Sequence, residues 1–189
     1  VMGPFRADYL AGRTPLPCAL CNPTVKFPAL FRRAEEVGAD LVATGHYAQI
    51  GTDEAGEPAL LRGAHRNDQA YMLARLPREW LPRLIFPIGG YEKTQVRDLA
   101  RHFQIPVAEK PDSMEICFIP DGDYAGWLEA RGATPPPGDF VDRQGNVLGR
   151  HKGIHHYTIG QRRGLSIPAQ HRLFVSDICP ADTTVILSD

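Results

Sequence analysis

The 189-residue chain lacks any run of about 18 consecutive apolar residues, and no signal-peptide pattern opens it. These absences argue against a membrane span and a secreted protein, so we expect a cytoplasmic protein with no membrane partner. Cysteine is also scarce, at four residues. In a reducing compartment so few cysteines indicate reactive thiols or metal ligands rather than a disulfide framework. With 43% hydrophobic and 23% charged residues, the composition is that of a globular protein.

Acidic residues are missing from one long segment, between Asp142 and Asp177. The same segment holds four histidines and six positive charges, namely Arg143, Arg150, Lys152, Arg162, Arg163 and Arg172. Such segregation is typical of a surface that contacts a phosphate backbone. A solvated face of a small domain would show the same pattern, and both interpretations stay open at this point.

Two cysteines, Cys18 and Cys21, lie in the proline-rich stretch PLPCALCNPTVKF. Asn22 is a favoured N-cap residue and Pro23 suits the first helical position, so we predict a helix that begins there, with both cysteines in the preceding loop. Pro28 then predicts either a kink or a regular helix that restarts at Pro28. The helix N-terminus would favour a thiolate at Cys21, although a CxxC pair without chemistry is the alternative.

A short buried strand is predicted over 41–44, in the sequence GADLVATGHYAQI. Together with the preceding helix it makes half of a parallel α/β unit. Ligands of open α/β sheets bind beyond the carboxyl ends of strands, which is where Gly45 and His46 follow. A structural role for His46 is the alternative.

Further along, the pattern predicts a turn-rich hairpin or surface loop over 51–58 and a helix over 92–103 that turns Val96, Leu99, Ala100 and Phe103 inward. A buried strand over 116–119 would carry Cys117. We place a domain boundary near Pro120. Beyond it we predict a short helix over 124–130 and two hairpins, whose turns lie at 144–146 and 180–182.

Six motifs occur in order along the chain: PxPCxxCNxxxKF, ATGHY, NDQAYML, PIGxxxKxxVR, DSMEICFIP and GxxxYTIGQRRGL. Together they closely resemble the bacterial tRNA-specific 2-thiouridylases, the MnmA family, over nearly the whole chain. The resemblance implies an α/β fold class: the C-terminal half of an ATP-pyrophosphatase (adenine nucleotide hydrolase-like) parallel-sheet domain over 1–119, then a small, β-rich central domain over 120–189. The family's SGGxDS loop and C-terminal barrel have no match, so we expect an internal piece of a longer enzyme that is inactive alone.

The resemblance also implies the reaction. ATP, with Mg²⁺, would adenylate the 2-oxygen of the wobble uridine in the tRNAs for Lys, Glu and Gln, and a persulfide sulfur would replace AMP. Cys117 matches the persulfide-carrying cysteine, and Cys21 matches the second catalytic cysteine, which forms a disulfide with Cys117. The sulfur would come from a cysteine desulfurase or another sulfur-donor protein. We therefore expect a tRNA-uridine 2-sulfurtransferase.

Binding residues follow from the same motifs. Gly45 matches an ATP contact. The tRNA contacts implied by the resemblance are Leu16, Pro17, Cys18, His46, Asn67, Asp68 and Gln69. Asp68 and Gln69 by residue type alone would simply cap a helix. Two positions depart from the family, because Asn67 stands where lysine is frequent and Leu16 where asparagine is common.

Cys18 also departs from the family pattern, because some members carry aspartate at this position. Three thiolates, from Cys18, Cys21 and Cys117, would suit an iron–sulfur cluster with one open iron site, which is a different route of sulfur delivery. A third hypothesis is a non-catalytic tRNA-binding or metal-binding module that keeps the basic segment and the cysteines. A related ATP-pyrophosphatase that thiolates another base is a fourth.

Overall fold

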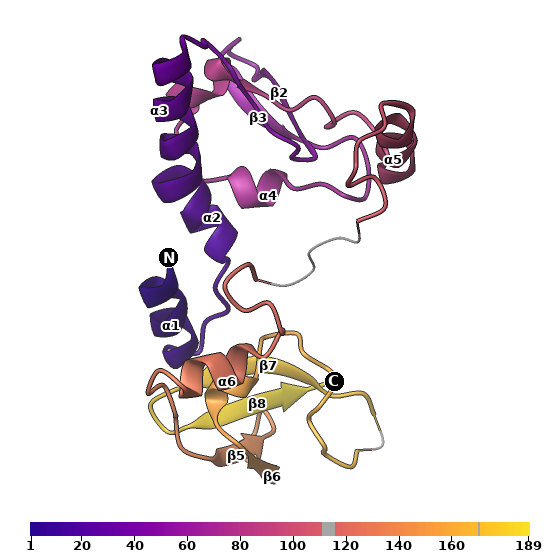
Figure 1. The fold of residues 1–189 in the computed structure, drawn as a ribbon. Helices are drawn as coiled ribbons and strands as arrows, with labels where there is room; N and C mark the ends of the chain where they lie inside the picture. The colour runs from indigo at the N-terminus through magenta and orange to yellow at the C-terminus, as the bar shows by residue number, and fades with distance from the viewer. Residues whose placement is uncertain (111–115, 170) are drawn as a thin grey trace. The chain divides into compact units, whose positions relative to one another are not determined.

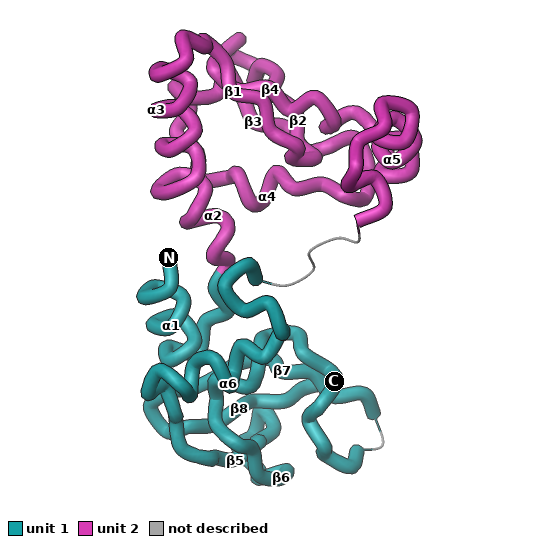
Figure 2. Tube along the Cα trace, viewed as in Figure 1, with its two compact units in different colours: residues 1–15, 113–189 teal, residues 16–112 magenta. Residues whose placement is uncertain are grey.

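The computed structural model describes residues 1–110, 116–169 and 171–189. The chain divides into two compact units, one formed by residues 1–15 and 113–189 and the other by residues 16–112 (Figure 2). Residues 1–15 therefore pack with the later part of the chain, which the sequence does not predict. The domain boundary near Pro120 stays a prediction. Across the described residues, no helix has both the length and the apolar character needed to cross a membrane.

A long helical stretch opens the unit of residues 16–112 (Figure 1). It consists of α2 (Pro17–Cys21), a π-helical segment (Asn22–Lys26) and α3 (Phe27–Val37). Within it the Phe27 N–H donates to the carbonyl of Asn22, five residues back. Pro23 and Pro28 have no N–H, so they cannot complete the ordinary i→i−4 pattern here. The regular helix restarts at Phe27, which agrees with the second of the two outcomes that Pro28 predicts.

Four strands complete the framework of this unit. β1 (Val42–Ala43) pairs in parallel with β4 (Leu84–Ile85), so a strand follows α3 as predicted, but it is shorter than the predicted 41–44 and only Val42 is buried. β2 (Ala48–Thr52) and β3 (Pro58–Arg62) form the predicted antiparallel hairpin. The core beneath them takes residues from α3, the strands, α4 (Ala70–Leu73) and a 3₁₀ segment (Arg78–Arg83); its most buried members are Phe27, Ala48 and Leu73.

α5 (Lys93–His102) is the predicted helix over 92–103, but its predicted inward face is wrong. A capping box starts the helix, in which Gln95 Oε1 accepts from the Glu92 N–H at 2.8 Å. No residue of α5 is buried, and Leu99 and Phe103 are 38% and 68% exposed. Periodicity shows which face of a helix is apolar, whereas cover for that face has to come from elsewhere in the fold.

The unit of residues 1–15 and 113–189 contains a four-stranded sheet in the order β6-β5-β8-β7 (Figure 1). Its strands are β5 (Gly138–Val141), β6 (Val147–His151), β7 (Phe174–Cys179) and β8 (Thr184–Ser188). The β5–β6 and β7–β8 pairs are the two predicted hairpins, and β5 and β8 pair in parallel between them. The sheet's core includes the fully buried side chains of Phe140, Val175, Val185 and Leu187.

A second small core in this unit joins α1 (Met2–Leu10) to α6 (Tyr124–Glu129). The Phe5 ring lies 5.3 Å from the Phe118 ring and 5.7 Å from the Trp127 ring, both edge-on. Asp123 caps α6 by accepting from the Gly126 N–H at 2.9 Å, which explains why the predicted short helix begins there. α1 is thereby fixed to a part of the chain more than 100 residues away.

Candidate functional site

Cys18 and Cys21 lie on a helix, and the predicted loop around them is wrong. α2 begins at Pro17, with Leu16 in the N-cap position, so the helix starts six residues before the predicted Asn22–Pro23 start. Pro17 suits the first helical position of α2 as well as Pro23 would suit that of the predicted helix. Cys18 therefore takes the place near the helix N-terminus that the sequence assigns to Cys21. The two half-buried thiols are three residues apart and share one face of the helix.

Asn22 serves packing instead of capping. Its side chain is 1% exposed, and Nδ2 donates to the carbonyl of Met72 at 2.8 Å. The bond joins the cysteine-bearing helix to the end of α4, fifty residues along the chain. Nothing local in the sequence signals that partner. The consequence is that the segment just after Cys21 is held rigidly against the core of its unit.

His46 lies just beyond the carboxyl end of β1, as predicted. Its Nδ1 is hydrogen-bonded to Thr44 Oγ1 at 2.7 Å, and its ring lies about 6 Å from the rings of Phe27 and Phe86. Burial, with a smaller contribution from the Lys26 charge, lowers the pKa of His46 to about 4. The ring is neutral at pH 7, so it can offer a hydrogen bond to a ligand but no positive charge to a phosphate.

Gly45 has open space beside it. A Cβ at this position would meet only the end of the Ile88 side chain, at 3.9 Å. The backbone at the strand end is therefore accessible to a flat group such as a nucleotide base or sugar, which fits the ATP contact predicted here.

Asp68 and Gln69 hold the start of α4 in place. Asp68 Oδ1 accepts from the N–H groups of Gly63 and Ala70, at 2.8 and 3.0 Å. Gln69 Oε1 accepts from the Tyr47 N–H at 3.1 Å, and the Gln69 N–H donates to the Tyr47 carbonyl at 2.8 Å. The two side chains thus connect the turn after His46 to the hairpin and the helix, while the N-cap residue Gln69 makes no capping bond to α4 through its side chain. A tRNA contact by Asp68 or Gln69 stays a prediction.

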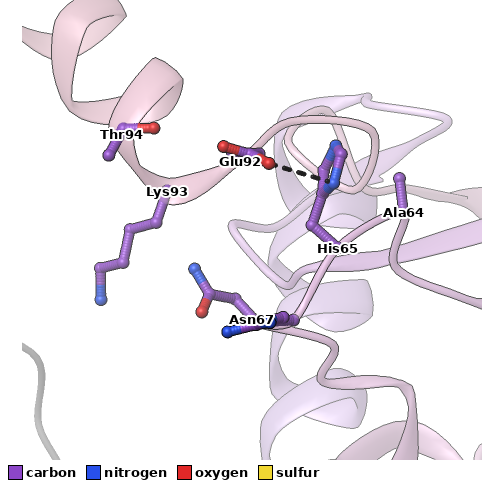
Figure 3. A pocket seen from close by; sticks show the side chains of 7 residues that line it. Ala64, His65, Asn67, Glu92, Lys93 and Thr94 are labelled. Atoms are coloured by element: carbon purple, nitrogen blue, oxygen red, sulfur yellow. Dashed lines mark ion pairs between the residues drawn. The ribbon is translucent and has the colours of Figure 1, made fainter.

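Asn67, by contrast, lines an open pocket of about 560 Å³. Figure 3 shows side chains from two segments around it, residues 64–67 and the start of α5. Its lining residues are Ala64, His65, Arg66, Asn67, Glu92, Lys93 and Thr94. His65 Nδ1 lies 3.6 Å from Glu92 Oε1, a contact that becomes an ion pair when the imidazole is protonated. Cationic and amide groups beside a helix N-terminus suit an anionic group such as a phosphate.

Six of these lining residues, all except Asn67, are absent from the sequence-predicted site. The signal that could have found Lys93 is the PIGxxxKxxVR motif, which contains it. The other five give no signal, because the pocket forms only where two segments distant in the sequence meet.

Cys117 lies in a turn, and the predicted buried strand over 116–119 is wrong. The Ile119 N–H donates to the Ile116 carbonyl at 2.7 Å, which closes a tight turn around Cys117 and Phe118. Ile119 is 1% exposed, and the Phe118 ring packs against Phe5, so the turn is anchored in the core shared by α1 and α6. The Cys117 side chain is exposed. The first residues of the DSMEICFIP motif, 112–115, lie outside the described residues.

The three cysteines of the predicted site belong to different units. Cys18 and Cys21 lie in the unit of residues 16–112, and Cys117 lies in the other. A disulfide or a shared cluster that joins the two units stays a prediction. The spacing of Cys18 and Cys21 fits two ligands of such a cluster, because both thiols face the same side of one helix turn.

The acid-free segment forms a second open pocket, of about 260 Å³. Arg162, His171 and Arg172 are among the residues that line it. The loop before it is fixed to β7, because the Gly160 N–H donates to the Val175 carbonyl at 2.7 Å and the Val175 N–H donates to the Gln161 carbonyl at 2.9 Å. The arginines are exposed on an ordered loop, as a phosphate-contacting surface requires.

Comparisons with known proteins match two successive domains in the chain. A family model described as the tRNA methyl transferase HUP domain matches residues 1–121, and one described as the tRNA methyl transferase PRC-barrel domain matches residues 127–189.

Curated relatives are similar over almost the whole chain. A tRNA-specific 2-thiouridylase MnmA of Carboxydothermus hydrogenoformans is 47% identical over 98% of the chain, and proteins of the same name from Geobacter metallireducens and Acidobacterium capsulatum are 52% and 48% identical over 93% and 98%. The chain spans about half the length of these relatives, between 48% and 52%. The chain therefore belongs to the tRNA-specific 2-thiouridylase (MnmA) family, with a HUP domain followed by a PRC-barrel domain.

Proposed function

We propose that this chain carries the sulfur-transfer cysteines, and part of the ATP and tRNA surface, of an enzyme that thiolates the 2-position of the wobble uridine in tRNA. The observation that carries the proposal is the exposed thiol of Cys117, held in a turn that Phe118 and Ile119 anchor. Although the matching domain models are named for methyl transfer, the cysteines supply the nucleophilic sulfur that thiolation needs. Relatives that are 47% to 52% identical bear the name of that reaction.

The chemistry proceeds in three steps. The 2-oxygen of uridine is a poor leaving group, so it is first adenylated by ATP, with Mg²⁺, and pyrophosphate is released. The terminal sulfur of a persulfide on Cys117 then bonds to C2, and AMP departs with the former uridine oxygen. Finally the Cys21 thiolate attacks Sγ of Cys117. This breaks the S–S bond, leaves the sulfur on the base and joins the two cysteines in a disulfide, which an external thiol reductant reopens.

The reaction needs a tRNA acceptor and a protein that donates sulfur. The acceptors we propose are the tRNAs for Lys, Glu and Gln, modified in the cytoplasm, and the donor is a cysteine desulfurase or another sulfur-carrier protein. A carrier has to reach Cys117 to load it, and an exposed turn permits that approach, whereas a buried strand would not. Gly45 is the proposed ATP contact, with His46 and Asn67 on the tRNA side.

The decisive experiment replaces Cys117 by serine in the protein encoded by the complete gene. We expect Cys117→Ser to abolish 2-thiouridine, measured by mass spectrometry of nucleosides from modified tRNA, and to leave tRNA affinity unchanged. Cys179→Ser is the matched control, because Cys179 is a half-buried thiol at the end of β7 and has no part in the proposal. Normal thiolation by Cys117→Ser would overturn the assignment.

Cys18 separates the persulfide route from a cluster route. The i,i+3 placement of Cys18 and Cys21 on α2 also suits an iron–sulfur cluster completed by Cys117, with sulfide delivered from an open iron site. In the persulfide route Cys18→Ser retains thiolation, whereas in the cluster route it abolishes both thiolation and the colour of anaerobically reconstituted protein. Colourless, iron-free protein after reconstitution excludes the cluster.

A non-catalytic tRNA-binding module is favoured by one observation, the ordered basic loop beside β7. That alternative predicts tRNA binding without release of pyrophosphate from ATP. A pyrophosphate assay with and without tRNA distinguishes the module from the enzyme.

A further inference from the structure

Two adjacent histidines and one glutamate converge on one point in the unit of residues 1–15 and 113–189. His155 and His156 belong to a 3₁₀ segment (Ile154–His156), and Glu129 is the last residue of α6. His155 Nε2 lies 3.0 Å from Glu129 Oε1, and His156 Nε2 lies 3.2 Å from the same oxygen. One ligand atom of each residue lies within 4.8 Å of the other two. We propose that Glu129, His155 and His156 form a binding site for Zn²⁺.

The separations fit a tetrahedral zinc ion. Zinc bonds to imidazole nitrogen and carboxylate oxygen are about 2.0–2.2 Å long, and neighbouring ligand atoms of a tetrahedron are then roughly 3.3 Å apart. Both measured nitrogen–oxygen distances are within a few tenths of an ångström of that value. All three ligand atoms lie within 4.8 Å of one another, and in the zinc-bound form each neutral ring would turn its Nε2 lone pair to the metal and keep its hydrogen on Nδ1.

The zinc-binding nitrogens of both rings face the same oxygen of Glu129, and the ring centroids are 4.2 Å apart. His155 is 1% exposed, so its Nε2 is shielded from water and meets the carboxylate. Two imidazole nitrogens and a carboxylate oxygen that converge in this way are a donor set that zinc binds.

The backbone is shaped to hold His155 in this position. Gly153 has φ 146°, in the region that favours glycine, and a Cβ there would lie 2.7–2.8 Å from atoms of the His155 ring. The ring is thus seated against the bare backbone of Gly153.

The exposure of the three side chains indicates how zinc would enter and what would supply its fourth ligand. The His155 side chain is 2% exposed, whereas those of His156 and Glu129 are 26% and 42% exposed. Metal can therefore enter from the Glu129 side, and three protein ligands leave a fourth position for water. Two imidazoles and one carboxylate select zinc over Mg²⁺ and Ca²⁺, which prefer oxygen ligands alone. The bound ion would fasten α6 to the segment just before the basic loop.

The test uses protein in which Cys18, Cys21 and Cys117 are replaced by serine, so that thiolates do not bind the metal. After chelator treatment, calorimetric titration with Zn²⁺ should show one site per chain, and Co²⁺ should give the visible bands of a tetrahedral nitrogen–oxygen site. Glu129→Gln and His156→Gln should each weaken Zn²⁺ binding at least tenfold, and Zn²⁺ should raise the melting temperature of the parent protein but not of these variants.

His171→Gln is the matched control, because His171 is an exposed histidine of the same acid-free segment outside the cluster. We expect it to bind Zn²⁺ as the parent does. The two diagnostic variants alter partly exposed side chains, and circular dichroism verifies that they fold. Absence of stoichiometric Zn²⁺ in the parent protein, or equal binding by parent and both variants, would overturn the proposal. Neither result bears on the thiolation proposed above, which does not involve these residues.

Discussion

His46 shows how a single residue's surroundings set its chemistry. The half-buried ring lies near Phe27 and Phe86 and is bonded to Thr44, and burial together with Lys26 holds its pKa near 4. A histidine in this setting resists protonation, so it acts on a ligand as a neutral hydrogen-bonding group.

This depressed pKa makes a prediction about stability and pH. The unfolded chain protonates His46 near pH 6.5 and the folded chain only near pH 4, so the unfolded state binds more protons between these values. The stability that the neutral ring contributes is present above pH 6.5 and is lost as the pH falls toward 4. We expect a loss of about 1–2 kcal/mol from this residue, after allowance for the ring's partial solvent contact. Urea unfolding at pH 7 and pH 4.5 measures it.

The variant His46→Gln removes the titrating group, so its free energy of unfolding should fall less between these two pH values. His102→Gln, which removes an exposed histidine at the end of α5, should keep the full loss. Equal pH dependence of His46→Gln and the parent protein would contradict the inferred role of burial.

The motifs shared with the family supplied the predicted site residues, but they gave no information about the exposure of those residues. Cys117 was placed as one of the predicted site residues, yet ICFI has the apolar run of a buried strand and forms a turn instead. The reason is that Phe118 and Ile119 pack on α1 and α6, and the described residues give the segment no neighbouring strand. Such partners lie far away in the sequence, and a local pattern cannot reveal them.

At the scale of elements, helix starts were decided by tertiary contacts. Both Leu16–Pro17 and Asn22–Pro23 are acceptable starts by local rules. In the structure Asn22 has helical dihedral angles and its buried Nδ2 donates to the Met72 carbonyl, so Asn22 lies within the helical stretch and the helix begins at Pro17. The hairpins, in contrast, were predictable, because their turn residues and alternating strands are local signals.

The loop after β4 depends on one close backbone approach. A Cβ on Gly89 would lie 1.7 Å from the Ala48 carbonyl oxygen, which belongs to β2, while a Cβ on Gly90 would meet nothing within 4 Å. The Gly89 carbonyl also accepts from the Ala64 N–H at 2.9 Å. Gly89 thus fixes the loop between the hairpin and the pocket at the start of α5.

We therefore expect Gly89→Ala to lower the free energy of unfolding by about 2 kcal/mol or more, because two backbone segments must separate. Gly90→Ala, one position away, should change it by less than about 0.5 kcal/mol. Urea denaturation of both variants checks the difference. Similar stability of the two would show that the β2 contact is not required.

At the scale of the whole molecule, the sequence predicted the α/β and β-rich parts but not how the chain divides between compact units. Residues 1–15 form α1, whose Phe5 packs on Phe118 and Trp127. This packing between segments more than 100 residues apart has no signature in composition or periodicity. Charge segregation, in contrast, is visible directly in the sequence, and the structure places its arginines on the surface.

Two neighbouring arginines of the acid-free segment are placed to contact tRNA. Arg162 and Arg163 are exposed, and among the described residues no carboxylate forms an ion pair with either. The Gln161 side chain holds their loop, accepting from the Thr158 N–H at 3.0 Å and donating to the Arg163 carbonyl at 3.0 Å. Arginines on a fixed loop, free of competing carboxylates, are available to phosphates, and each such contact releases counterions when tRNA binds.

We expect tRNA affinity to fall steeply as salt rises, and the double variant Arg162→Ala/Arg163→Ala to bind roughly tenfold more weakly at low salt, with a slope of log K against log salt reduced by about 2. The charge-matched control is Arg33→Ala/Arg101→Ala, which removes two arginines already paired with Glu36 and with Asp98 and Glu109. Because those charges are neutralised within the protein, the control should leave both affinity and slope unchanged. Equal salt slopes for the two double variants would place the tRNA surface outside this loop. A slope reduced by about 2 in Arg162→Ala/Arg163→Ala alone would assign two phosphate contacts to the loop.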